Sequence, residues 1–106
     1  MDEICDVEIT APDAEWLVAF TRTLIEDRRA ASGNVIAPVR SVYRWQGGIE
    51  EAEEAKVILH TRRSVVPEII GRVEREHPYE VPGVRVTTVT ASDSYRMWVL
   101  DETRSA

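Results

Sequence analysis

The sequence contains few of the features that mark secreted or membrane-bound proteins. Its 106 residues include a single cysteine, Cys5, so the chain forms no internal disulfide. No apolar run approaches the roughly 20 residues that span a bilayer, and the N-terminus shows no basic segment followed by an apolar one. These absences predict a cytoplasmic protein without membrane contact, in which Cys5 is a small buried residue of a strand rather than a reactive thiol.

Basic charge and catalytic motifs are also scarce. Thirteen Lys and Arg residues stand against 19 Asp and Glu residues, which gives a net charge of −6 without a basic stripe. Nucleic-acid phosphates require clustered basic residues, so nucleic acid is excluded as a partner. The sequence has no Gly-rich phosphate loop, nucleophile elbow or paired metal-ligand motif, and therefore predicts a protein that is not an enzyme.

What the sequence does contain is a long β-hairpin. Residues 39–45 and 55–61 are rich in β-branched and aromatic residues and flank the turn sequence Gln46-Gly47-Gly48. Each arm extends for roughly ten residues, against the five or six of an ordinary strand. Tyr43 and Trp45 share one face near the tip, where only another chain would cover them. We therefore predict a homo-oligomer built through the hairpin.

Hydrophobic periodicity predicts the elements before the hairpin. Residues 5–9 alternate between apolar and acidic and predict a strand. A helix is expected to open at Thr10-Ala-Pro-Asp13, with Thr10 as the cap, and to run to about Ala31. Gly33 is expected to end it in the left-handed cap position. The next strand is expected from Val35, with Pro38 marking an edge or a bulge.

The same reasoning covers the rest of the chain. A second helix is expected to follow Arg62-Arg63-Ser64, with Val66, Ile69, Ile70 and Val73 at helical spacing, and to end at His77-Pro78. A strand over residues 84–90 and a short helix beginning at Ser92-Asp93 are expected to follow. Residues 1–106 thus form one α+β domain of β-α-β-β-α-β order with a short C-terminal helix. We expect two helices on one face of an antiparallel sheet, in strand order 4-1-3-2, and subunit packing on the other face.

Several short sequence motifs of this chain resemble those of the CutA divalent-cation tolerance family. They are residues 41–51 (SVYRWQGGIEE), Thr61-Arg62 and residues 77–82 (HPYEVP). The resemblance implies a ferredoxin-like protomer, a tight homotrimer, and a role in tolerance of divalent metals, chiefly copper, without an established catalytic reaction. The chain departs from the family pattern at Ser32, where a cysteine is common, and at Gly48 and His60, where lysine is common.

Candidate metal ligands lie at two places. His77 and Glu80 are the leading candidates and are expected near the hairpin end of the sheet, beside Tyr79 at the subunit interface. His60 is a third candidate, expected at the opposite end and separated from His77 by roughly 18 Å of helix. The alternative interpretations are that His77 only terminates its helix and that His60 is a half-exposed strand residue.

Two further groups carry alternative functions. Arg62 and Arg63, at the start of the second helix, are candidates for binding an anion, and Trp45 for stacking a nucleotide base. The preferred interpretations are exposed charge for the two arginines and interface packing for Trp45. These residues would suit a trimeric regulatory module resembling the PII signalling proteins. An acidic shoulder beside the turn consists of Glu50, Glu51, Glu53 and Glu54. It suggests either a site for a hard cation or a solvated strand edge that discourages aggregation, and the solvated edge is the preferred interpretation.

Overall fold

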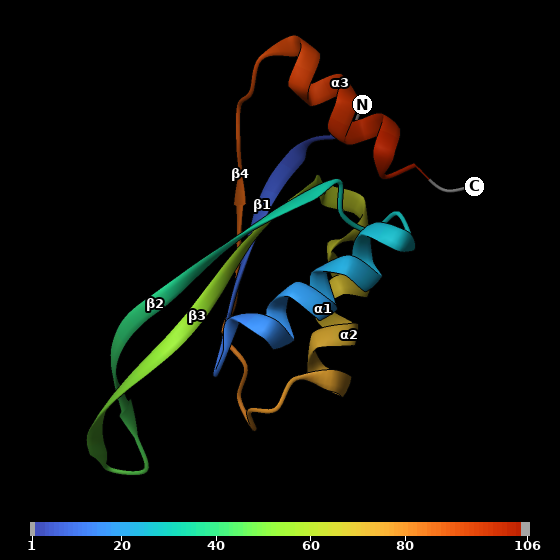
Figure 1. Cartoon of the computed structure of the whole chain (residues 1–106). Coiled ribbons are helices and arrows are strands. Elements are labelled where there is room, and N and C mark those ends of the chain that lie inside the picture. The colour runs from blue at the N-terminus through green and yellow to red at the C-terminus, as the bar shows by residue number, and fades with distance from the viewer. Residues whose placement is uncertain (1, 105–106) are drawn as a thin grey trace.

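The computed structural model describes residues 2–104 and shows four strands and three helices (Figure 1). In chain order these are β1 (Ile4–Ala11), α1 (Ala14–Glu26), β2 (Ser32–Trp45), β3 (Gly48–Arg62), a single 3-10 turn (Arg63–Val65) leading into α2 (Val66–Glu76), β4 (Val84–Thr88) and α3 (Asp93–Glu102). The strands form one antiparallel sheet in the order β2-β3-β1-β4. This is the predicted order, and the predicted ferredoxin-like β-α-β-β-α-β fold is confirmed.

Helices α1 and α2 lie on the same side of the sheet (Figure 1). The alternation of β1 turns its odd-numbered residues, including Cys5, toward these helices, and they are fully buried with the apolar residues of β3. Leu17 and Leu24 of α1 and Ile69 of α2 close this core from the helical side. Among residues 2–104, the opposite face is covered at one end, where Val99 of α3 packs on Ile4 of β1 and on Ala31, just before β2. Most of that face is therefore open within one chain.

Strands β2 and β3 continue well beyond the helices as a twisted two-stranded arm (Figure 1). They contain 14 and 15 residues, and the turn between them consists of Gln46 and Gly47 alone, with φ angles of 49° and 83°. Both angles are positive, as a two-residue turn that matches strand twist requires. The predicted irregularity at Pro38 is confirmed, because the register with β3 shifts between Ile36 and Val39. The Ala37–Pro38 peptide is cis.

The predicted start of the first helix was wrong. Thr10 belongs to β1, which continues pairing with β3 as far as Ala11. The cap is Asp13, whose carboxylate accepts a hydrogen bond from the backbone N–H of Trp16 at 2.8 Å. Pairing with β3 satisfies the backbone of Thr10 better than an early helix turn would, so the helix cap lies three residues later than predicted.

The predicted end of that helix was also wrong, because α1 stops at Glu26 and Arg28 takes the left-handed conformation, with φ 58°. The backbone N–H of Ala31 donates to the carbonyl of His60, and β2 starts one residue later. Gly33 therefore lies in a strand and not at a helix cap. Its lack of a side chain serves packing, since a Cβ there would lie 2.7 Å from a methyl group of Thr21. At the other end of the chain, β4 is shorter than predicted and stops at Thr88.

Candidate functional site

A hollow of about 680 Å³ extends from the base of the hairpin arm, at Glu54, along the arm to Trp45 beside the turn. It is lined by residues from β1, from both strands of the arm and from the segment after α2, among them Tyr43, Trp45, Glu54, Tyr79 and Glu80. The predicted grouping of the hairpin aromatics with Tyr79 and Glu80 at one end of the sheet therefore holds in the structure. The side chains of Tyr43 and Trp45 are 43% and 37% exposed, so one chain leaves them partly uncovered.

Tyr79 and Glu54 form a polar contact in this hollow. The phenol of Tyr79 donates a hydrogen bond to Oε2 of Glu54 at 2.7 Å, and Glu54 is only 9% exposed. Burial, the hydrogen bond to Glu54 and the negative charge of Glu54 raise the pKa of the Tyr79 phenol above its ordinary value of 10. Tyr79 is thus a persistent donor that compensates a buried carboxylate.

Glu54 was not singled out from its neighbours by sequence reasoning. Glu50, Glu51 and Glu53 are exposed, as a solvated shoulder predicts, but Glu54 is buried. The feature that distinguishes Glu54 is its pairing register. Glu54 lies opposite Val39, on the strand face that also carries Tyr43. Glu80 lines the same hollow and is exposed, which leaves its carboxylate accessible.

His77 sits behind the hollow with both ring nitrogens occupied. Its Nε2–H donates to the carbonyl oxygen of Thr10 at 2.7 Å, and its Nδ1 accepts the backbone N–H of Tyr79 at 3.0 Å. The ring packs edge-on against Trp16, and its exposure is 9%. A metal would have to displace one of these hydrogen bonds to reach a ring nitrogen. In this structure His77 ends α2 and ties β1 to the segment that carries Tyr79.

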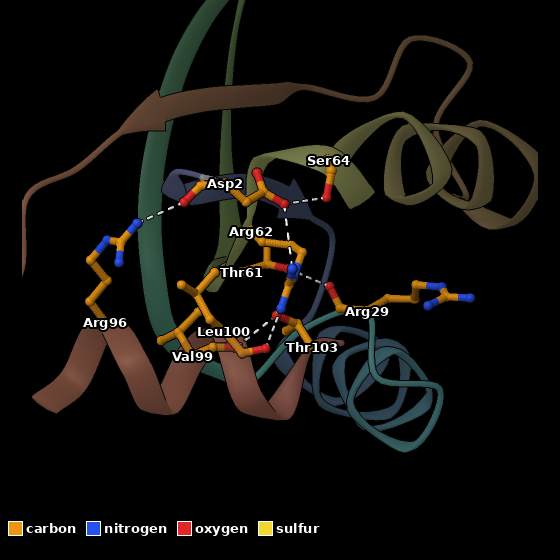
Figure 2. A network of polar contacts seen from close by, with 9 residues as sticks. All are labelled: Asp2, Arg29, Thr61, Arg62, Ser64, Arg96, Val99, Leu100 and Thr103. Carbon is orange, nitrogen blue, oxygen red and sulfur yellow. Dashed lines mark hydrogen bonds and ion pairs between the residues drawn. The ribbon is translucent and has the colours of Figure 1, made fainter. Parts of the chain in front are cut away.

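The opposite end of the sheet holds Arg62 in a polar network under α3 (Figure 2). Its guanidinium donates to the carbonyl of Leu100 and to Oγ1 of Thr103, the latter at 3.0 Å, and pairs with Asp2 at 3.6 Å. Carbonyl, hydroxyl and carboxylate oxygens thus surround a side chain that is 20% exposed. Arg62 anchors α3 to the sheet and is not available to bind a free anion without releasing the helix.

Arg63 and His60 also have partners at this end. Arg63 donates to Oγ1 of Thr88 at 3.1 Å. His60 lies on the open face of the sheet, and its Nδ1 is hydrogen-bonded to the phenol of Tyr95 at 2.5 Å. It therefore belongs to a different part of the molecule from His77, as predicted. Burial raises the pKa of the nearby Cys5 thiol despite the charge of Arg63, so the predicted inert cysteine agrees with the structure.

These residues do not assemble a complete metal centre within one chain. Among residues 2–104, no three His, Cys, Asp or Glu side chains come together in a way that would hold a metal ion. The only cysteine is buried, and His77 uses both nitrogens in hydrogen bonds. A copper site of three or more protein ligands therefore does not fit the side chains of a single chain.

Comparison with known proteins decides the family. The family model described as CutA1 divalent ion tolerance protein matches residues 5–102. The chain belongs to the CutA1 divalent ion tolerance family. Among its curated relatives, the divalent-cation tolerance protein CutA of Pyrococcus horikoshii is 34% identical over 99 residues, which cover 92% of this chain and 96% of the relative. The human protein CutA is 35% identical over 98 residues, 92% of this chain, but the chain spans only 55% of its length.

Solved structures of CutA1 proteins share the whole fold. The crystal structure of CutA1 from Oryza sativa superposes with a TM-score of 0.92 at 27% identity, covering 98% of this chain and 96% of that one. CutA1 from Pyrococcus horikoshii superposes with a TM-score of 0.88 at 33% identity, covering 95% and 99%. The chain likewise spans about half of the chloroplastic CutA of Arabidopsis thaliana, 55% of its length. Within residues 2–104, no helix is long and apolar enough to cross a membrane.

Proposed function

We propose that this CutA1-family chain acts in divalent-cation tolerance as a cytoplasmic homotrimer that binds its ligand and catalyses no reaction. The observation that carries the proposal is the uncovered hairpin arm. The molecule measures 44 × 25 × 22 Å, and Val42, Tyr43, Trp45 and Ile49 on the arm are 37–71% exposed. Tyr43 and Trp45 lie on one face of the arm and Val42 and Ile49 on the other, and large apolar side chains exposed on both faces are typical of a protein–protein interface.

The trimer places the hairpin hollow between subunits. Tyr43, Trp45 and Tyr79 are the residues that we assign to this interface, because they line the hollow with part of their ring surface uncovered. The number of subunits comes from the resemblance of the sequence to the CutA family. A cytoplasmic location is supported by the single, unpaired cysteine.

Metal binding in this proposal uses ligands from more than one subunit or completes its coordination with water. The cation is divalent, with copper as the metal to test first, and the candidate ligands remain His77, Glu80 and His60. Glu80 has an exposed carboxylate, and His60 has only one ring nitrogen in a hydrogen bond. His77 would need to exchange a hydrogen bond for the metal. The alternative of an anion-binding regulatory module has less support, because Arg62 is committed to anchoring α3.

Native mass spectrometry of the intact chain tests the assembly. We expect three times the chain mass for the parent protein and a smaller species for Trp45→Glu, which places an unpaired charge in the interface. Val18→Glu is the matched control, because Val18 is 46% exposed on α1, away from the arm. A trimeric Trp45→Glu at micromolar concentration, or a monomeric parent, would show that the hairpin does not build the assembly.

A further inference from the structure

A second hollow, of about 310 Å³, lies on the open face of the sheet beside α3. Side chains from three elements meet there: Asp6 of β1, His60 of β3 and Tyr95 of α3. It shares no lining residue with the hollow at the hairpin base. His60 and Tyr95 are hydrogen-bonded to each other, whereas Asp6 has no hydrogen-bond or ion-pair partner among residues 2–104.

One nitrogen of His60 is fixed, and the other is not engaged. The Nδ1 atom is 2.5 Å from the Tyr95 phenol oxygen, and the two rings meet edge-on with centroids 5.7 Å apart. The Tyr95 ring in turn packs against the ring of Trp98, and this contact holds Tyr95 in place. No hydrogen bond or ion pair reaches Nε2 from any residue between positions 2 and 104. Imidazoles that bind metals are commonly held in this way, with one nitrogen oriented by a neighbouring group and the other directed to the ion.

Asp6 lies directly opposite His60 in the antiparallel pairing of β1 with β3. Residues in such a pair share a face, with Cβ atoms roughly 5 Å apart. Yet no ion pair of 4.0 Å or less joins them, and no other described residue pairs with the carboxylate through a hydrogen bond or an ion pair. The next carboxylate along β1, Glu8, has such a partner, since Lys56 pairs with it at 3.4 Å. Asp6 thus has an uncommitted carboxylate and His60 one uncommitted ring nitrogen, Nε2, and a side-chain rotation of Asp6 is needed to bring these two groups to the spacing of ligands on one ion.

We propose that this hollow binds a divalent transition-metal ion through Nε2 of His60 and a carboxylate oxygen of Asp6, with water in the remaining coordination positions. A mixed imidazole and carboxylate pair suits Cu²⁺, Zn²⁺ or Ni²⁺ and selects against Mg²⁺ and Ca²⁺, which prefer oxygen alone. The inference rests on the proposed role in divalent-cation tolerance and gives that role a site within one chain. Two protein ligands make the site weaker than a structural centre with four.

Tyr95 is a positioning residue in this site. When its oxygen accepts the Nδ1–H of His60, the imidazole takes the tautomer that leaves the Nε2 lone pair for the metal. Removal of the phenol oxygen in Tyr95→Phe should lower the affinity by about tenfold, the lower end of the range for such supporting groups. The same change should not abolish binding, because both ligands remain.

Calorimetric titration of the full chain with Cu²⁺, Zn²⁺ and Mg²⁺ tests the proposal, with electron paramagnetic resonance of the copper form to detect the coordinating nitrogen. We expect about one copper per chain, weaker zinc binding and no magnesium binding. Copper affinity should fall more than tenfold in His60→Gln and in Asp6→Asn, with loss of the nitrogen coupling in His60→Gln. Asp101→Asn is the control, because it removes one exposed carboxylate of α3 outside the hollow.

The outcomes separate this site from the broader function. Copper uptake that is unchanged in His60→Gln but lost in Glu80→Ala would overturn the site and leave cation binding at the hairpin hollow intact. Absence of copper and zinc uptake in the parent protein would overturn both the site and the cation-binding part of the proposed function. Circular dichroism and native mass of each variant establish that the fold and assembly are unchanged when affinity is compared.

Discussion

At the scale of single residues, the hydrogen bond from Tyr79 to Glu54 shows how the hairpin hollow is stabilised. It joins the segment after α2 to the middle of β3, across 25 positions of sequence. In Tyr79→Phe, the 9%-exposed Glu54 carboxylate would lose its donor. We expect the free energy of unfolding to fall by about 1–2 kcal/mol, as for other unsatisfied buried acceptors. Urea denaturation measures this, and Tyr43→Phe, at an exposed ring, should stay within about 0.5 kcal/mol of the parent.

The same phenol predicts a dependence of stability on alkaline pH. Because the pKa of Tyr79 is raised above 10 in the folded chain, the folded state holds this proton where the unfolded state releases it. The contribution to stability is fully present below pH 10 and is lost as the pH rises through the folded pKa. Thermal unfolding followed from pH 9 to pH 11 should show a steeper decline for the parent than for Tyr79→Phe. Parallel declines would mean that Tyr79 does not titrate abnormally.

At Gly33, β2 lies so close to α1 that there is no room for a side chain. A Cβ at this position would lie 2.7 Å from Thr21 and 3.2 Å from Leu59 and Val57, all in buried surroundings. Gly33→Ala should therefore destabilise the fold by about 1–3 kcal/mol, the usual cost of overpacking. The double variant with Thr21→Ser, which removes the closest methyl group, should recover part of the loss. Full stability of Gly33→Ala alone would show that the strand can move away from the helix.

Residues whose role depends on register or on distant partners were the ones that the sequence could not assign. The position of His77 after α2 was readable from His77-Pro78, but its bonds to Thr10 and Tyr79 depend on the meeting of two separate segments. Glu54 looked like its acidic neighbours, because periodicity alone does not show which strand face another segment covers. Gly33 was read as a helix cap, since local propensity does not include the packing of Thr21.

At the scale of elements, α3 depends on Arg62 for its position on the sheet. The helix contributes one fully buried apolar residue, Val99, so polar contacts have an unusually large share in holding it. Arg62→Ala removes the donors to Leu100 and Thr103 and leaves Asp2 without this ion pair (Figure 2). The sequence predicted that this helix exists, from its apolar spacing. It does not predict the anchor, because the sequence around Arg62 indicates only an exposed or anion-binding charge.

Arg62→Ala should lower the free energy of unfolding by about 2–3 kcal/mol, as expected for the loss of charge-assisted hydrogen bonds. Amide hydrogen exchange should lose protection mainly in α3, while α1 and α2 remain protected. Arg85→Ala is the control, because Arg85 is exposed on β4 and lies outside the network. Unchanged exchange in α3 would mean that Val99 and its neighbours hold the helix without Arg62.

At the scale of the whole molecule, the hairpin arm extends beyond the hydrophobic core of the domain (Figure 1), so the core helices do not pack against most of it. Strand order and the two-helix layer followed from the sequence because alternation and helical spacing are local signals that right-handed connections constrain further. The length of the arm was underestimated, since the acidic segment from Glu50 to Glu54 continues β3 without a break. Two-stranded ribbons are marginal alone in water. In the proposed trimer, the arm gains its stability from a partner chain.

This argument predicts that thermal stability depends on protein concentration. When a trimer unfolds to three free chains, each tenfold dilution costs about 0.9 kcal/mol per chain by mass action. For a domain of this size, the midpoint should fall by about 4 °C per tenfold dilution. Differential scanning calorimetry over a hundredfold concentration range measures the shift, and Val18→Glu should follow the parent. A midpoint independent of concentration in the parent would mean that the arm is stable within a single chain or that subunits remain associated after unfolding.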